Sequence, residues 1–193
     1  MLVASLIVLL FVSVPLTGGS LDRLADLDFR GVRWLMGALV AQLAIIVVAP
    51  GGDTEVHRAV HVGTYAAGAV FLWANRRIPG VVVLGAGALL NAVAIAANGG
   101  VMPASAEAML AAGMALPSGD EFVNSSPVAG ATLGFLGDVL AVPAWVPGAK
   151  VFSVGDVLIA VGATIIVHAA CRRRAAREED VPATSAAPAT PVT

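Results

Sequence analysis

The stretch VVVLGAGALLNAVAIAA, residues Val81–Ala97, contains no charged residue and a single strongly polar one, Asn91. A helix that crosses the hydrocarbon core of a bilayer needs about 20 mostly apolar residues, with a lower limit of about 17. This stretch therefore predicts a membrane-spanning helix, and similar stretches elsewhere in the chain would make the protein a multi-pass membrane protein.

Four other stretches of the same kind lie on either side of it, over residues 2–16, 34–49, 59–74 and 154–171. The 11 basic and 13 acidic residues of the chain all fall between the five stretches or at their edges. Because an ionised side chain at the centre of a spanning helix costs several kcal/mol, this distribution is typical of real spans. We predict an all-α integral membrane bundle of about five transmembrane helices.

The composition supports the same class of protein. Of the 193 residues, 58% are apolar and 12% are charged, and the mean hydropathy is +0.88. A soluble domain carries about 25% charged residues, so the lipid bilayer is the first expected partner. No basic stripe is interleaved with aromatic residues, which argues against nucleic acid as a partner. The single cysteine, Cys171, excludes an internal disulfide.

The arginines predict how the chain crosses the membrane. Nine arginines follow the first, third and fifth stretches: Arg23, Arg30, Arg33, Arg76, Arg77, Arg172, Arg173, Arg174 and Arg177. The alternate loops hold only Arg58 and Lys150. Since cytoplasmic loops carry the excess of basic residues, we expect a cell-membrane protein with its N-terminus outside and its C-terminus in the cytoplasm.

The two ends of the chain have separate predictions. The first stretch has no positive residues before it, so we interpret it as an uncleaved anchor and not as a signal peptide. Residues 1–174 would form the multi-pass membrane domain. Residues 175–193 are rich in Ala, Pro and Thr and predict a disordered cytoplasmic tail.

Residues 98–153 form an outer loop that is too long for a simple connector, since loops beyond about 15 residues are usually functional or disordered. Ser105 precedes a short helical pattern as a plausible N-cap. The apolar segment 132–142 is too short to span, so we predict a re-entrant or interfacial segment. We expect a folded cap in which Phe135, Leu136 and Trp145 are buried, because an apolar segment left in water would be an exposed patch.

Three blocks of this sequence carry a resemblance to a known family. They are Asn98-Gly99-Gly100-Val101-Met102-Pro103, then Phe135-Leu136-Gly137-Asp138, and then residues 151–162. Together they resemble an uncharacterised family of small multi-pass bacterial membrane proteins, a domain of unknown function, over about residues 1–170 of this chain. The resemblance implies a multi-pass membrane protein with no established activity.

These blocks supply the candidate site. We predict a ligand- or partner-binding site on the outer face, for a peptide or another membrane protein. The candidate binding residues are Asn98, Gly99, Gly100, Met102, Pro103, Phe135, Gly137 and Ser153.

A weaker resemblance links residues 152–162 to the last motif of lipoprotein signal peptidase, the type II enzyme. The motif's aspartate, one of two catalytic aspartates in that family, corresponds to Asp156. Asp138 precedes Asp156 by about the number of residues that separates the two catalytic aspartates in that family. The resemblance implies an alternative function, a membrane-embedded aspartyl peptidase-like enzyme with an Asp138/Asp156 dyad. Two such carboxylates would share a proton and activate a water molecule.

Structural interpretations of the same aspartates stay open. Asp156 follows Ser153 by three residues, which is the spacing of a capping box at a helix N-terminus. Asp138 lies in an apolar segment, where a carboxylate must be hydrogen-bonded, paired or protonated, and a turn residue would satisfy this.

The remaining polar residues predict packing more than chemistry. Asn91 and Asn98 are seven residues apart on one helix face, which favours packing against another helix, and Asn98 is also placed to bind the outer loop. His57 and His61 share a face but lack the glutamate of the zinc-protease motif, so we predict no metal site and no cofactor. His168 has no partner that the sequence identifies.

Overall fold

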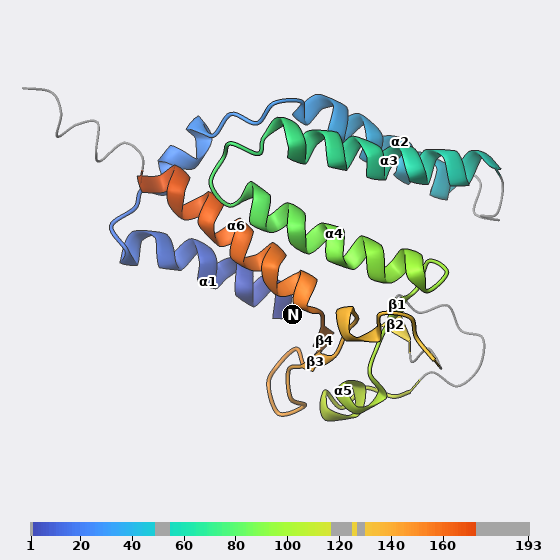
Figure 1. Cartoon of the computed structure of the whole chain (residues 1–193). Helices are drawn as coiled ribbons and strands as arrows, with labels where there is room; N and C mark the ends of the chain where they lie inside the picture. Colours follow the sequence, from blue (N-terminus) through green and yellow to red (C-terminus); the bar gives the residue numbers. More distant parts are fainter. Residues whose placement is uncertain (1, 49–54, 117–124, 127–129, 173–193) are drawn as a thin grey trace, which may run out of the picture.

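The computed structural model describes residues 2–48, 55–116, 125–126 and 130–172 of the chain (Figure 1). The described part is mostly helical. Its long helices are α1 (Leu2–Leu16), α2 (Val32–Val48), α3 (Glu55–Ala74), α4 (Val81–Ala97) and α6 (Val154–Arg172). The five apolar stretches of the sequence therefore do form helices, with α2 and α3 beginning a few residues earlier than predicted. The tail predicted to be disordered, 175–193, lies outside the described residues.

Among the described residues, α6 alone is both long enough and apolar enough to cross a membrane by length and composition. Shorter apolar helical segments cover Ile7–Leu16, Val32–Ala44 and Val81–Ala97. Their side chains are widely exposed: Val8, Leu43 and Leu89 are each at least 60% exposed on the surface of the helices.

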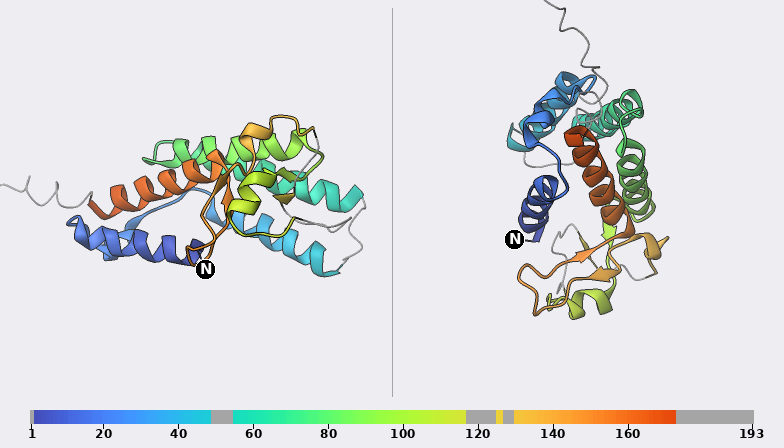
Figure 2. Two further views of the ribbon diagram at one scale, coloured as in Figure 1. Left: turned by 90° about the horizontal axis from the view of Figure 1, so that it is seen from below. Right: turned by 90° about the vertical axis from the view of Figure 1, so that its left-hand side faces the viewer.

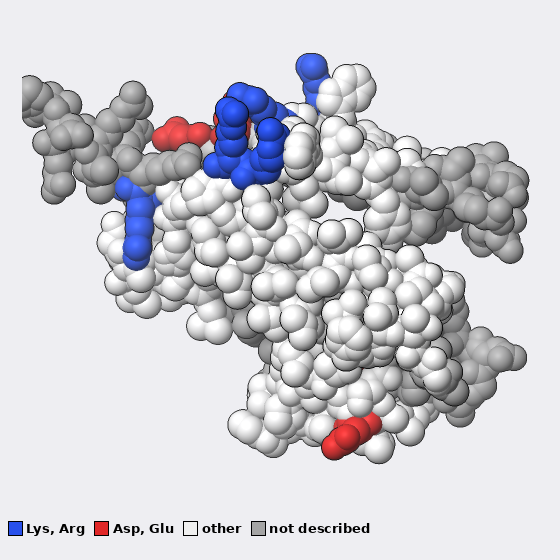
Figure 3. Space-filling model, viewed as in Figure 1, with Lys and Arg blue, Asp and Glu red and all other residues white. Residues whose placement is uncertain are grey.

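The helices run in alternating directions between two chemically different ends. Helices α1, α3 and α6 run toward one end and α2 and α4 run away from it (Figures 1 and 2). We call this the arginine end, because six of the described arginines gather there at helix termini and turns (Figure 3), while Arg58 lies near the start of α3. They are Arg23, Arg30, Arg33, Arg76, Arg77 and Arg172. The segment 98–153 folds at the opposite end, and we call its described residues the cap (Figure 1).

Glycines let α4 and α6 pack with their backbones in contact. A Cβ atom built on Gly87 would lie 2.8 Å from the backbone nitrogen of Ile159, and one built on Gly162 would lie 2.7 Å from the Cα of Leu84. Gly80, which precedes α4, has a φ of 91° and approaches α6 in the same way. Small residues that allow such close approach are typical of helix pairs in membranes.

Helix α1 and the following 3-10 helix η1 (Leu21–Asp26) hold the other end of α6. The His168 ring hydrogen-bonds Ser13 Oγ through Nε2 at 3.0 Å and Thr17 Oγ1 through Nδ1 at 3.2 Å. Arg23 Nη1 donates to the carbonyl oxygen of Cys171 at 3.0 Å, which satisfies a carbonyl at the end of α6. The sequence held a signal for the histidine's partners, since Ser13 and Thr17 are four residues apart and share a helix face.

Asn75, directly after α3, fixes the chain segment that leads into α2. Its Oδ1 accepts from the backbone nitrogen of Arg30 at 2.8 Å, and its Nδ2 donates to the carbonyls of Arg30 at 2.9 Å and Phe71 at 2.8 Å. Asn75 is 2% exposed, and the rings of Phe29 and Phe71 lie 5.7 Å apart beside it. A buried amide with all these bonds made is a stable clamp between two loops.

The cap is folded, as the sequence predicted. Its elements are β1 (Met102–Pro103), α5 (Ala106–Ala111), β2 (Ser125–Ser126), η2 (Gly134–Leu136), β3 (Leu140–Ala141) and β4 (Val151–Phe152). Strands β1 and β2 pair in parallel, and β3 and β4 pair antiparallel. Its core is formed by Ala108, Met109, Ala112 and Val151. The predicted N-cap is confirmed, because Ser105 Oγ accepts from the backbone nitrogen of Ala108 at 3.3 Å.

Candidate functional site

The loop of residues 131–139, which we call the Phe135 loop, is fastened to the end of α4. Asn98 Nδ2 donates to the carbonyl of Thr132 at 2.7 Å, and its Oδ1 accepts from the nitrogen of the same residue at 2.9 Å. Nδ2 also donates to the carbonyl of Ala94, at 2.8 Å. The predicted bond between Asn98 and the loop is therefore confirmed, and it repeats the arrangement made by Asn75.

The other end of the Phe135 loop pairs with the chain after α4. The backbone nitrogen of Asp138 donates to the carbonyl of Pro103 at 2.8 Å, and the nitrogen of Ser105 donates to the carbonyl of Asp138 at 3.0 Å. A Cβ atom on Gly137 would collide with the carbonyl oxygen of Pro103, so a glycine is required at this contact. Met102 and Pro103 are buried here, and two of the three blocks that carry the family resemblance thus meet.

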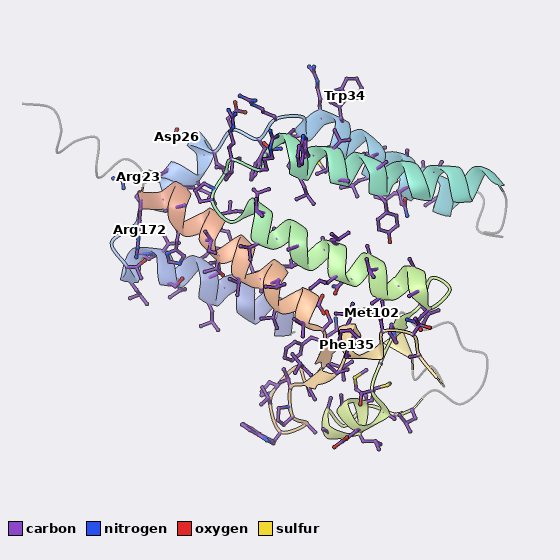
Figure 4. The ribbon with its side chains drawn as sticks, in the orientation of Figure 1. Arg23, Asp26, Trp34, Met102, Phe135 and Arg172 are labelled. Atoms are coloured by element: carbon purple, nitrogen blue, oxygen red, sulfur yellow. The ribbon has the colours of Figure 1, made fainter. Side chains whose placement is uncertain are left out.

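Between these two attachments the loop adopts a strained turn that presents an aromatic ring. Leu133 has a φ of 55°, and it is the one non-glycine among the described residues with positive φ. Such a conformation costs on the order of 1–3 kcal/mol and persists where the surroundings enforce it. The 3-10 turn η2 follows, and the side chain of Phe135 is 68% exposed (Figure 4).

The prediction that the large apolar side chains in this part of the cap are buried was wrong. The segment forms a 3-10 turn followed by a short strand, and its re-entrant or interfacial position stays a prediction. Phe135 and Trp145 are 68% and 83% exposed, and Leu136 is half-buried, where we predicted burial for all three. The physical reason is that backbone hydrogen bonds and the Gly137 contact fix this segment, so its fold does not depend on burying its aromatic side chains.

A second polar cluster joins α4 to the start of α6. Asn91 Nδ2 donates to Asp156 Oδ1 at 2.8 Å, and Ser153 Oγ donates to Asn91 Oδ1 at 2.8 Å. The backbone nitrogen of Ser153 donates to Asp156 Oδ2 at 3.1 Å, while that of Asp156 donates to Ser153 Oγ at 2.9 Å. The capping-box interpretation is thus confirmed, and a carboxylate in this position also complements the helix dipole.

The candidate residues consequently separate by role. Asn98, Met102, Pro103 and Gly137 build and fix the Phe135 loop, while Ser153 and Asp156 belong to the cluster with Asn91. Gly99 and Gly100 form the turn after α4, with φ values of 70° and 93°. The sequence did not reveal that Asn91, within α4, is the partner of Asp156 in the first turn of α6. The conformation of Leu133 had no sequence signal.

The sequence offered one pair of candidate metal ligands, His57 and His61. Among the residues that the structure describes, no group of three or more His, Cys, Asp or Glu side chains is placed to hold a metal ion. The side chains of His57 and His61 lie outside the described part of the chain.

Asn98→Leu should free the Phe135 loop without unfolding the helices, because it removes both bonds to Thr132. We expect faster amide hydrogen exchange over residues 131–139, measured by mass spectrometry on the purified full chain. Asn75→Leu is the matched control, since it removes the equivalent clamp on Arg30 and should affect residues 29–32 instead. Unchanged exchange of the Phe135 loop in Asn98→Leu would show that the clamp does not hold it.

These features define the class of the protein. It is a mostly helical chain whose long helices carry charges at their ends, and a small folded cap lies at one end of the molecule. Residues 26–168 match the family described as a family of unknown function (DUF5317), and the chain belongs to this family. The prediction of an uncharacterised family is therefore confirmed. Neither the curated proteins nor the solved structures contain a match to the chain.

Proposed function

We propose that this protein is an integral membrane protein of five spans, with the N-terminus and the cap outside and the arginine end in the cytoplasm. The support is the distribution of charge. Six of the described arginines lie at one end of alternating helices, while Arg58 lies near the start of α3, and many of the exposed side chains along the helices are apolar. A surface of that kind is stable in lipid, and the excess of arginine at one end matches the cytoplasmic side.

We further propose that the cap binds an apolar segment of a peptide or another membrane protein through the Phe135 loop. The observation that carries this function is an exposed phenylalanine on a loop that is fastened at both ends and strained at Leu133. A rigid exposed aromatic side chain is the usual anchor of a binding surface, because little conformational entropy is lost when it docks.

The peptidase-like alternative stays a prediction. Both carboxylate oxygens of Asp156 accept hydrogen bonds, from Asn91 and from the backbone of Ser153, and this is the geometry of a helix cap. That engagement favours the binding function over a dyad with Asp138.

A photoreactive amino acid at position 135 tests the binding function in intact cells. We expect a discrete adduct with a protein or peptide, and its loss when Asn98→Leu loosens the loop. The matched control is position 110, since Leu110 is 62% exposed on α5 of the same cap. Adducts with lipid alone, or equal adducts at both positions, would overturn the proposal of a binding loop.

A further inference from the structure

Two arginine–tryptophan pairs lie at the arginine end, one at the start of α2 and one at the end of α3. The guanidinium carbon of Arg33 lies 5.5 Å from the ring centroid of Trp34, and that of Arg76 lies 4.3 Å from the ring centroid of Trp73. Trp34, which Figure 4 labels, is 71% exposed, and Trp73 is 68% exposed, so both rings lie on the surface.

The two pairs are held together by the buried clamp described above. Asn75 binds the backbone of Arg30 and follows α3, so the start of α2 and the end of α3 form one unit. Arg77 lies on the same turn as Arg76. Arg76 uses one donor on the carbonyl of Trp73, at 2.8 Å, and an arginine has five N–H donors in all.

We propose that these pairs bind the phosphate group of an anionic glycerophospholipid in the cytoplasmic leaflet. The inference rests on the membrane placement proposed above. A phospholipid has an anionic phosphodiester next to acyl chains, and the site offers guanidinium groups next to exposed indole rings and apolar helix faces. Arginine binds phosphate with paired hydrogen bonds, and tryptophan prefers the boundary between headgroups and acyl chains.

The charge around the site favours an anion. The described arginines at this end number six, against the three aspartates Asp22, Asp26 and Asp28. Loss of both stacked arginines removes their paired hydrogen bonds to the phosphate and should weaken the preference for an anionic lipid by about tenfold or more. Loss of an arginine that makes no such bonds should change the preference far less.

Native mass spectrometry of the full-length protein in detergent tests the site, with phosphatidylglycerol and phosphatidylcholine titrated separately. We expect wild type to prefer phosphatidylglycerol, and the double variant Arg33→Gln/Arg76→Gln to lose that preference with its helix content unchanged. Arg172→Gln is the control, because this arginine lies at the same end and contacts the carbonyl of Thr17 instead of a tryptophan. The control should keep the preference.

Three outcomes would overturn the proposal. The first is an equal preference in wild type and the double glutamine variant. The second is full retention of the preference in Arg33→Lys/Arg76→Lys, which would assign it to charge alone. The third is equal competition by inorganic phosphate, which would make this a site for the free ion. Since the titration in detergent does not depend on sidedness, its failure is distinguishable from an error in the proposed topology.

Discussion

Gly87→Ala is expected to destabilise the protein and Gly63→Ala to leave it unharmed or more stable, although the chemical change is the same. A methyl group on Gly87 meets the backbone of α6 at Ile159, which cannot move aside as a side chain does. Overpacking costs about 1–3 kcal/mol, and occasionally more. Here two helix backbones must separate, so we expect a loss in the upper part of this range.

The control, Gly63→Ala, is expected to change the stability in the opposite direction. A Cβ atom on Gly63, in α3, meets no described atom within 4 Å. Alanine there gains up to about 1 kcal/mol of helix propensity over glycine. Unfolding in detergent, followed by circular dichroism, measures both variants. An equal effect of the two substitutions would contradict the close packing of α4 against α6.

Single substitutions in the cluster of Asn91, Ser153 and Asp156 are expected to lower the stability of the protein. Exchanging two of its side chains is expected to restore part of that stability. Asp156→Asn keeps one acceptor oxygen for two donors, so one hydrogen bond is lost and a donor is left unsatisfied, at a cost of about 1–3 kcal/mol. Asn91→Asp is expected to be worse, because it places two carboxylates where a bond of 2.8 Å now lies.

The exchanged variant Asn91→Asp/Asp156→Asn restores the complement of donors and acceptors. The carboxylate at 91 can accept from Ser153 Oγ and from the amide at 156, whose oxygen can accept from the backbone of Ser153. We expect the double variant to be more stable than either single variant, with a coupling energy of about 1–3 kcal/mol in a double-mutant cycle. Additive losses would show that these three groups do not act as one network.

The helices could be predicted from the sequence because their signal is local. Five apolar stretches are long enough for a helix, and charges or glycines end each of them. The first residues of α4 and α6 were predicted correctly. The caps were equally local, since Ser105 and the pair Ser153 and Asp156 follow known spacings. The role of Asn98 was also foreseen, because a polar residue at the end of an apolar helix must find a partner.

The contacts between distant segments could not be predicted in the same way. Nothing in the spacing of Asn75 indicates that it would bind the backbone of Arg30, and the partner of Asp156 is 65 residues away. The exposure of Phe135 was missed for a related reason. Apolar character predicts burial only where the side chain decides the fold, and in this loop the backbone bonds of Asp138 and Thr132 decide it.

The proposed topology is tested most directly by labelling single engineered cysteines in intact cells with a membrane-impermeant maleimide. Trp145→Cys places a thiol at an 83% exposed position of the cap, and Arg77→Cys places one at the arginine end. The native Cys171 is fully buried, so wild type should not react. We expect labelling at 145 in intact cells and at 77 only after the membrane is opened. Labelling at 77 with protection at 145, or labelling of both in intact cells, would contradict a membrane protein with its cap outside.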